Sequence, residues 1–182
     1  MNYRVASRFF LCSLIFCSLI GDSGAAGSDV QEAIVSLKAA FAKPIPLEEF
    51  AKGNRFTRRT TVLTFTGDAR KFAYSAKETS THYAKPTNSV TSTVVIARAS
   101  EALFSDLKGV SREKTEFMGK TVGLDTLTLL CSPDKECFKS TGPDVVIGSR
   151  GLHGAQPVKF ADPETAASAK LAIETLIRAS QR

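Results

Sequence analysis

The stretch LLCSPDKECFKS, residues 129–140, contains Cys131 and Cys137, the two cysteines that lie outside the first seventeen residues. The leucines before Cys131 and Phe138 after Cys137 favour two strands, and Pro133-Asp134 between them is typical of a turn. In an oxidising compartment, two thiols six positions apart are usually joined. We therefore predict a disulfide across the neck of a β-hairpin, worth about 2.4 kcal/mol by loop entropy.

A redox-active pair and a metal site are the alternatives for these two cysteines. Thiol oxidoreductases typically place two residues between their cysteines at the start of a helix, whereas five residues separate Cys131 from Cys137. A structural zinc site needs about four ligands, and His82 and His153 are the two histidines of the chain. The sequence therefore favours a structural disulfide and predicts no metal and no cofactor.

Residues 1–26 have the layout of a secretory signal peptide. Arg4 and Arg8 are followed by an uncharged apolar run over residues 9–20, and small residues lead to a predicted cleavage site after Ala26. A membrane anchor is the first alternative, but the run is shorter than the roughly 20 residues that span a bilayer. Lipidation at Cys17 is the second. We predict a periplasmic or secreted protein whose mature chain has no transmembrane segment.

Removal of residues 1–26 would leave 156 of the 182 residues, about the size of one domain. The whole chain has 24 basic and 18 acidic residues, and the mature part would carry a net charge of about +5. This mild excess is compatible with an anionic partner or with simple solubility. Export, the absence of tryptophan and the scattered charges disfavour a nucleic-acid partner.

Residues 27–55 are predicted to form an N-terminal helical segment. Val30, Ile34, Leu37 and Phe41 recur at helical spacing over residues 28–43. Proline then breaks this helix, and the sequence predicts a second short helix between Pro46 and Gly53. The segment either covers one end of the main fold or forms a loosely attached arm.

Residues 56–182 are predicted to form a single β-rich domain. Threonine, valine and alternating apolar positions indicate a meander of strands over residues 56–66, 70–77 and 88–99. A short helix and a charged loop are expected over 100–118. Further strands are expected near 120–131, 137–140, 144–148 and 157–160. About seven short strands then precede a C-terminal helix over 161–180, so the fold class is α+β.

The C-terminal helix has the clearest signals in the chain. Asp162 is the predicted N-cap, Pro163 stands at the first helical position, and a predicted inner stripe follows. That stripe contains Ala166, Ala169, Ile173 and Leu176, widened by Leu171, Ala172 and Ile177. Strands followed by one terminal helix resemble the element order of a pleckstrin-homology-like barrel over residues 56–180. The resemblance implies a closed barrel whose helix plugs one open end.

Arg58, Arg59, Arg70 and Lys71 are the candidate ligand-binding residues. In barrels of the type resembled, basic residues around the first hairpin can bind anionic headgroups. A hairpin of strands 56–66 and 70–77 would, however, place the two pairs at opposite ends. A solvated basic face is the alternative interpretation.

Catalytic patterns are weak in this sequence. Ser149 with His153 could act as nucleophile and base, but Ile147 replaces the first glycine of a nucleophile elbow. Asp125 is either a functional carboxylate in an apolar wall or a buried group bonded to the backbone or to an arginine.

We therefore expect an exported, soluble, non-enzymatic binding or interaction module, whose ligand is an anionic envelope component or a protein partner. The alternatives are a small periplasmic hydrolase using Ser149 and His153, and a structural accessory protein of the cell envelope.

Overall fold

The computed structural model describes residues 22–85, 87–117, 120–142 and 152–182. The described chain is α+β, as predicted, and consists of helices α1 (Asp22–Ala42) and α2 (Pro163–Ser180), a 3-10 turn η1 (Phe104–Asp106), and nine strands. The strands are β1 (Glu48–Lys52), β2 (Arg55–Phe65), β3 (Lys71–Ala84), β4 (Ser89–Leu103), β5 (Leu107–Phe117), β6 (Lys120–Cys131), β7 (Phe138–Thr141), β8 (Leu152–His153) and β9 (Ala155–Phe160).

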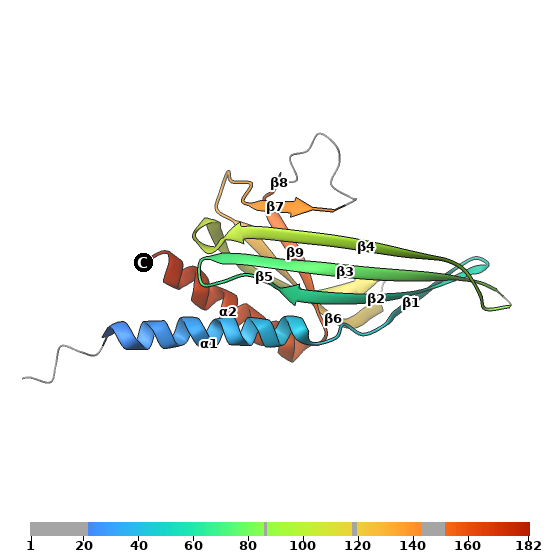
Figure 1. Ribbon diagram of the computed structural model, residues 1–182, viewed down its shortest axis with the longest axis horizontal. Helices are drawn as coiled ribbons and strands as arrows, with labels where there is room; N and C mark the ends of the chain where they lie inside the picture. Colours follow the sequence, from blue (N-terminus) through green and yellow to red (C-terminus); the bar gives the residue numbers. More distant parts are fainter. Residues whose placement is uncertain (1–21, 86, 118–119, 143–151) are drawn as a thin grey trace, which may run out of the picture.

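These strands form two antiparallel sheets. The larger sheet has the order β1-β2-β3-β4-β7-β8, and the smaller has the order β5-β6-β9. The two helices pack side by side, α1 against β2 and α2 against the smaller sheet (Figure 1). The sheets do not close into a barrel. The barrel expected from the pleckstrin-homology-like element order is therefore wrong, and α2 covers a sheet instead of plugging an opening.

The predicted meander is confirmed. β2, β3 and β4 are consecutive antiparallel neighbours, with Leu63 opposite Ala76 and Ala76 opposite Arg98. The strands are longer than expected, because β3 has 14 residues and β4 has 15. Gly67 is needed in the β2–β3 turn, since a Cβ atom there would clash with the carbonyl oxygen of Lys71.

Cys131 and Cys137 form a disulfide with their Cα atoms 5.7 Å apart, but the predicted hairpin across it is wrong. β6 ends at Cys131 and pairs with β5 and β9. β7 begins at Phe138 and pairs with β4 and β8 in the other sheet. The chain changes sheets here because Phe138 is fully buried and packs against Phe72, with ring centroids 6.4 Å apart. The disulfide therefore joins the two sheets at a corner.

Two further expectations are corrected. Residues 48–52 form strand β1 along β2 and not the predicted second helix. Residues 100–117 contain the end of β4, η1 and the whole of β5, where a short helix and a charged loop were expected. The expected strand at 144–148 lies outside the described residues. The signal peptide and its cleavage stay predictions, and so does the domain boundary after residue 55, which the β1–β2 pairing crosses.

Helix α1 shares the hydrophobic core of the sheets and is no loosely attached arm. Ile34, Leu37 and Phe41 are buried, as their spacing predicts. The ring of Phe41 lies 5.6 Å from that of Phe65 and 5.3 Å from that of Phe160, measured between centroids. Aromatic rings at such distances interact favourably beyond their burial. Phe41 therefore links the helix to both sheets.

Helix α2 begins as predicted. The Asp162 side chain accepts a hydrogen bond from the Thr165 backbone N–H at 2.8 Å, and Pro163 occupies the first turn. Of the predicted inner stripe, Ala166, Ala169, Ala172, Ile173, Leu176 and Ile177 are buried, whereas Leu171 is exposed. Leu171 points away because it lies on the flank of the helix opposite the sheet.

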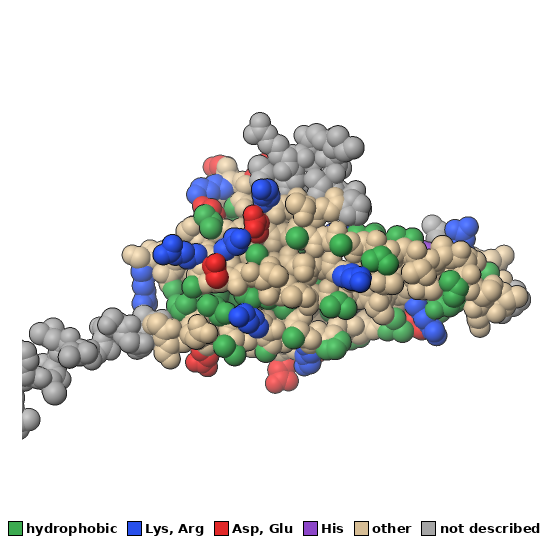
Figure 2. Space-filling view, in the orientation of Figure 1, with side chains coloured by type: hydrophobic (Ala, Val, Ile, Leu, Met, Phe, Trp, Pro, Cys, Tyr) green, Lys and Arg blue, Asp and Glu red, His purple; other side chains and the backbone are tan. Residues whose placement is uncertain are grey.

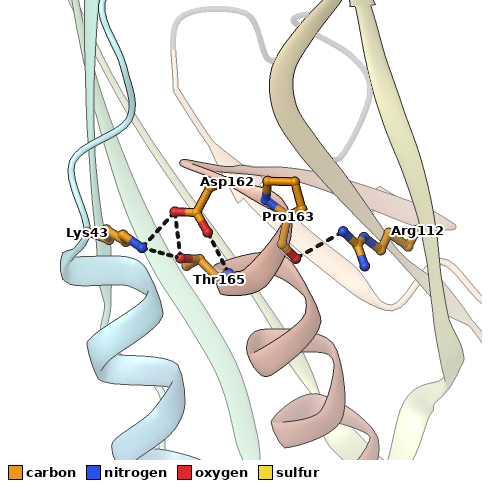
Figure 3. Close-up of polar contacts among 5 residues, drawn as sticks. All are labelled: Lys43, Arg112, Asp162, Pro163 and Thr165. Atoms are coloured by element: carbon orange, nitrogen blue, oxygen red, sulfur yellow. Dashed lines mark hydrogen bonds and ion pairs between the residues drawn. The ribbon is translucent and has the colours of Figure 1, made fainter.

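A polar junction joins the end of α1 to the start of α2 (Figure 3). Lys43 Nζ lies 2.7 Å from the Asp162 carboxylate and donates to Thr165 Oγ1 at 3.0 Å. The hydrogen bond from Lys43, with that from the Thr165 backbone, lowers the pKa of Asp162 to about 2. From the other side, Arg112 of β5 donates to the carbonyl oxygen of Pro163 at 2.9 Å. The junction therefore fixes both helices relative to the smaller sheet.

No helix in the described part of the chain combines the length and the apolar composition that crossing a bilayer requires.

Candidate functional site

The candidate site is a cleft between the two sheets, with a volume of about 600 Å³. One wall comes from the inner faces of β2, β3, β4 and β7, and the other from β6 and β9. Ile45, between α1 and β1, and Glu48, the first residue of β1, also line the cleft. This volume is in the range of small-molecule binding sites.

The floor of the cleft is a network of four polar side chains. Gln156 of β9 donates to the phenolic oxygen of Tyr74 at 2.9 Å. Its amide oxygen accepts from Ser100 at 3.0 Å and from Ser140 at 3.3 Å. The two serine oxygens lie 3.1 Å apart. Gln156 belongs to the smaller sheet, and the other three residues belong to the larger one. The network therefore joins the two sheets by hydrogen bonds where their apolar contact ends.

Burial determines the chemical state of Tyr74. It raises the pKa of the phenol to about 12, and the positive charge of Arg98 and the hydrogen bond from Gln156 offset this only in part. Tyr74 therefore stays neutral at physiological pH. Because its oxygen accepts from Gln156, its own O–H can still donate to a ligand in the cleft.

Charged side chains surround the mouth of the cleft. Arg59 lies 3.1 Å from Glu78, and Lys159 lies 3.2 Å from Glu48. With Arg98, the described lining contains three cationic and two acidic groups. Because the ion pairs are partly exposed, each contributes little to stability and can exchange partners at low cost. The cleft mouth is therefore net positive.

Apolar side chains form the remaining walls. Leu63 and Ala76 lie on the larger sheet, and Val158 and Pro157 lie on the smaller one. Val158 is buried, while Leu63 packs at the margin of the core. A ligand in this cleft would therefore meet apolar walls, hydroxyl and amide groups at the floor, and cations at the mouth.

The structure places Arg58 and Arg59 far from Arg70 and Lys71. Arg58 and Arg59 lie opposite Thr81 and Ser80, whereas Lys71 lies opposite Leu103 at the other end of β3. Arg59 lines the cleft, and its neighbour Arg58 faces the opposite side of the sheet. The four residues therefore do not form one site.

Three of these four cationic side chains also form ion pairs with nearby carboxylates. Arg58 donates to Glu49 at 2.9 Å, and its guanidinium lies 5.5 Å from the ring centroid of Phe56. Lys71 pairs with Glu101 at 3.2 Å, and the Glu78 partner of Arg59 is described above. At Arg70 it is the backbone N–H that donates to Asp68.

Asp125 is a bonded structural carboxylate. It is 4% exposed, and its Oδ2 atom accepts from Arg112 at 2.8 Å. The hydrogen bond to Asp125 raises the pKa of Arg112, so the guanidinium stays charged. This arrangement confirms the interpretation in which an arginine satisfies Asp125.

The proposed nucleophile pair is not described. Ser149 lies outside the described residues, and only the backbone of His153 is placed, in β8. The other histidine, His82, shares a hydrogen bond of 2.8 Å with Thr57. Within the described ranges, no three His, Cys, Asp or Glu side chains are grouped to hold a metal ion.

Sequence reasoning missed the cleft floor, because its residues come from four strands. Tyr74 follows Phe72 by two positions in the same strand, so both side chains lie on one face. The sequence could therefore assign Tyr74 to the inner face. Ser100, Ser140 and Gln156 give no such signal, since serine and glutamine are common on exposed strand positions. Their convergence depends on the pairing of β7 with β4, which the sequence did not predict.

No family model, curated protein or solved structure matches this chain.

Proposed function

We propose that this protein is an exported, non-enzymatic binding module that holds an anionic component of the cell envelope in the cleft between its sheets. The observation that carries the proposal is the cleft itself, about 600 Å³ in volume and floored by converging polar groups. Such a combination of apolar walls and a few convergent polar groups is typical of ligand sites.

The charges at the mouth support an anionic ligand. Arg59, Arg98 and Lys159 outnumber Glu48 and Glu78 in the described lining. A phosphate or carboxylate group at the mouth would gain charge-assisted hydrogen bonds from these cations, which are stronger than neutral ones. A phospholipid headgroup and a phosphorylated envelope polymer share this chemistry.

The chemistry of the floor supports binding over catalysis. The cleft-lining residues that the structure describes include no histidine or cysteine. The hydroxyl groups of Ser100 and Ser140 donate to the Gln156 amide oxygen, which is too weak a base to activate a nucleophile. Tyr74 is held neutral by its raised pKa. These groups can orient a ligand by hydrogen bonding.

Export is supported by two features. Residues 1–26 have the sequence pattern of a secretory signal peptide, and the Cys131–Cys137 disulfide is typical of oxidising compartments. Mass spectrometry of the native protein should find a chain that starts near residue 27 and lacks two hydrogens at these cysteines. An intact Met1 in a cytosolic fraction with both thiols reduced would contradict export.

Isothermal titration with two probes tests the ligand class. Free glycerophosphoglycerol represents a soluble phosphodiester, and vesicles of phosphatidylcholine with phosphatidylglycerol present the same phosphodiester on a lipid surface. Binding of both probes would favour recognition of the phosphate group alone, and binding of the vesicles alone would favour a membrane headgroup. Failure of both probes would contradict the proposal of an anionic ligand.

Matched arginine variants locate the binding site. Arg98→Gln removes a cation from the cleft and should weaken probe binding at least about tenfold, the loss of one charge-assisted hydrogen bond. Arg58→Gln removes the same charge from the opposite side of the sheet and should leave binding unchanged. If Arg58→Gln and Arg70→Gln weaken binding as much as Arg98→Gln, the predicted basic face is the site and the cleft is not.

A further inference from the structure

Each polar hydrogen of the cleft floor can be assigned to an acceptor, with one exception. Gln156 donates one amide hydrogen to Tyr74 at 2.9 Å and the other to the carbonyl oxygen of Pro157 at 3.2 Å. The Pro157 contact fixes the orientation of the amide, because the amide oxygen in that place would face another oxygen. Ser100 and Ser140 donate to the amide oxygen at 3.0 and 3.3 Å. The remaining hydrogen is that of the Tyr74 hydroxyl.

The Tyr74 hydroxyl accepts a hydrogen bond but donates none within the part of the chain that the structure describes. The residue is 8% exposed and lines the cleft. Its ring lies 5.7 Å from that of Phe41 and 5.8 Å from that of Phe72, so the phenol is held in place. A buried donor without an acceptor is unfavourable. The Tyr74 O–H therefore favours a molecule in the cleft that supplies an acceptor.

We propose that Tyr74 is a specificity-determining residue of the cleft, which donates its O–H to a ligand oxygen that carries no hydrogen. The inference rests on the proposed function, because it concerns the anionic ligand of the same cleft. A phosphate group supplies such an oxygen, and so does the carbonyl of an ester-linked acyl chain. An ammonium group in this position would leave the buried O–H unpaired, so the floor disfavours it.

The charge next to the phenol favours a phosphate oxygen. Arg98 lies opposite Ala76, which neighbours Tyr74 on the inner face of β3. Its positive charge acts on Tyr74 against the effect of burial, yet the pKa of the phenol is still raised to about 12, so the hydrogen is retained. Hydrogen bonds to a charged oxygen are stronger than those to a neutral one. We therefore expect the phosphate, and not an ester carbonyl, at the cleft floor.

The surface of the molecule offers less basis for selection than the floor. Figure 2 shows cationic and acidic side chains interspersed over the visible face of the body. At the mouth of the cleft, Arg59 and Lys159 are each paired with a carboxylate. Partly exposed charges of this kind are screened by solvent and distinguish poorly between anions. The buried phenol of Tyr74 therefore has more influence on which ligand binds.

Isothermal titration of the full chain with two probes tests the role of Tyr74. Glycerophosphoglycerol contains a phosphodiester and no carbonyl, whereas dihexanoylphosphatidylglycerol, kept below its micelle concentration, adds ester carbonyls. Tyr74→Phe keeps the ring and should weaken binding of both probes at least about fivefold, the loss of one hydrogen bond. A loss with the lipid alone would assign the acceptor to an ester carbonyl. Tyr83→Phe makes the same change outside the cleft lining and should leave both affinities unchanged.

A more acidic phenol separates hydrogen bonding from packing. Site-specific replacement of Tyr74 by 3-fluorotyrosine makes the O–H a stronger donor and should raise affinity about twofold. Damage to packing would lower the affinity instead. A loss in Tyr74→Phe without a gain from 3-fluorotyrosine would therefore overturn the inference.

The failure of this inference can be distinguished from the failure of the proposed function. If wild type binds a probe and Tyr74→Phe binds it equally well, Tyr74 is not the donor, and the proposed function stands. If wild type binds neither probe, both the inference and the proposed function are contradicted.

Discussion

The space between the two sheets is filled at one end and open at the other. At the filled end, the rings of Phe72, Phe104 and Phe138 are fully buried, and the disulfide joins the sheets. At the open end the same strands line the cleft. Along the inner face of β3 the residues are Phe72, Tyr74, Ala76 and Glu78, which become smaller or more polar in that order. The change in side chains along one strand therefore sets where the sheets meet and where they separate.

The cleft therefore results from the size and polarity of the side chains along one continuous sheet. Large apolar side chains bring two sheets to contact because their burial is favourable. Where Ala76 and Glu78 replace them, the same contact would leave a void or bury a charge, and both are unfavourable. Tyr74 stands at the boundary, with its ring against Phe72 and its oxygen in the cleft floor.

The largest expected effect comes from emptying the filled end. Phe72→Ala removes a fully buried ring that contacts Phe41, Phe65, Tyr74, Phe104 and Phe138. It should lower the free energy of unfolding by about 3–5 kcal/mol in urea titrations. Val94→Ala, on the same face beyond the cleft, should change it by less than about 0.5 kcal/mol. Similar losses in both variants would contradict the division into two ends.

Removing the disulfide that joins the two sheets should have the next largest effect on the free energy of unfolding. Replacing Cys131 and Cys137 together by serine should cost about 2.4 kcal/mol, the loop entropy of a seven-residue loop. Wild type measured with and without a reducing agent should show the same difference in its urea midpoint, and the double variant should not respond to the reductant. A reductant effect on the double variant would assign the loss to something other than this bond.

The cleft floor offers a smaller test. Ser100→Ala removes a buried hydroxyl that bonds to Gln156, and it should cost about 1 kcal/mol. Ser92→Ala, at an exposed position of the same strand, should have no measurable effect. Equal stability of the two variants would mean that the floor network does not hold the sheets together.

The junction between the helices, where the filled end gives way to the cleft, should give the smallest effect, visible in its pH dependence. Since the folded-state pKa of Asp162 is lowered from 3.8 to about 2, its contribution is present above about pH 4 and is lost as the pH falls to about 2. Asp162→Asn keeps the cap but removes the charge. Wild type should therefore exceed the variant in stability at pH 6, and the difference should shrink by pH 2. A constant difference would contradict the ion pair as its source.

The local signals in the sequence predicted the local elements well. The first helix, the three-stranded meander and the start of α2 follow from apolar spacing, threonine content and the Asp162-Pro163 pair. These features depend on neighbours along the chain, so a single sequence contains them. Burial of Ile34, Leu37 and Phe41 on one helix face follows from the same periodicity.

Features that depend on distant pairing were not predictable in this way. Residues 48–52, EEFAK, have good helix formers, but pairing with β2 makes them a strand. The sequence predicts a loop at β5, because its charges are those of a sheet edge, which periodicity does not distinguish from a polar loop. The partner of β7 could not be inferred either, since proximity along the chain favoured β6. The cleft depends on that pairing, and so the site was missed.

Only two residues separate Cys137 from Ser140, which reaches the cleft floor. β7 is held to β4 at three positions, and the disulfide is its covalent attachment at the other side of the corner. If the bond is reduced, β7 keeps its pairing with β4 and β8 but loses its covalent link to β6, so Ser140 is held less firmly in the cleft floor. Under the proposed function, a copy with reduced cysteines would therefore bind its ligand more weakly, and full affinity would require the oxidising conditions that form this bond.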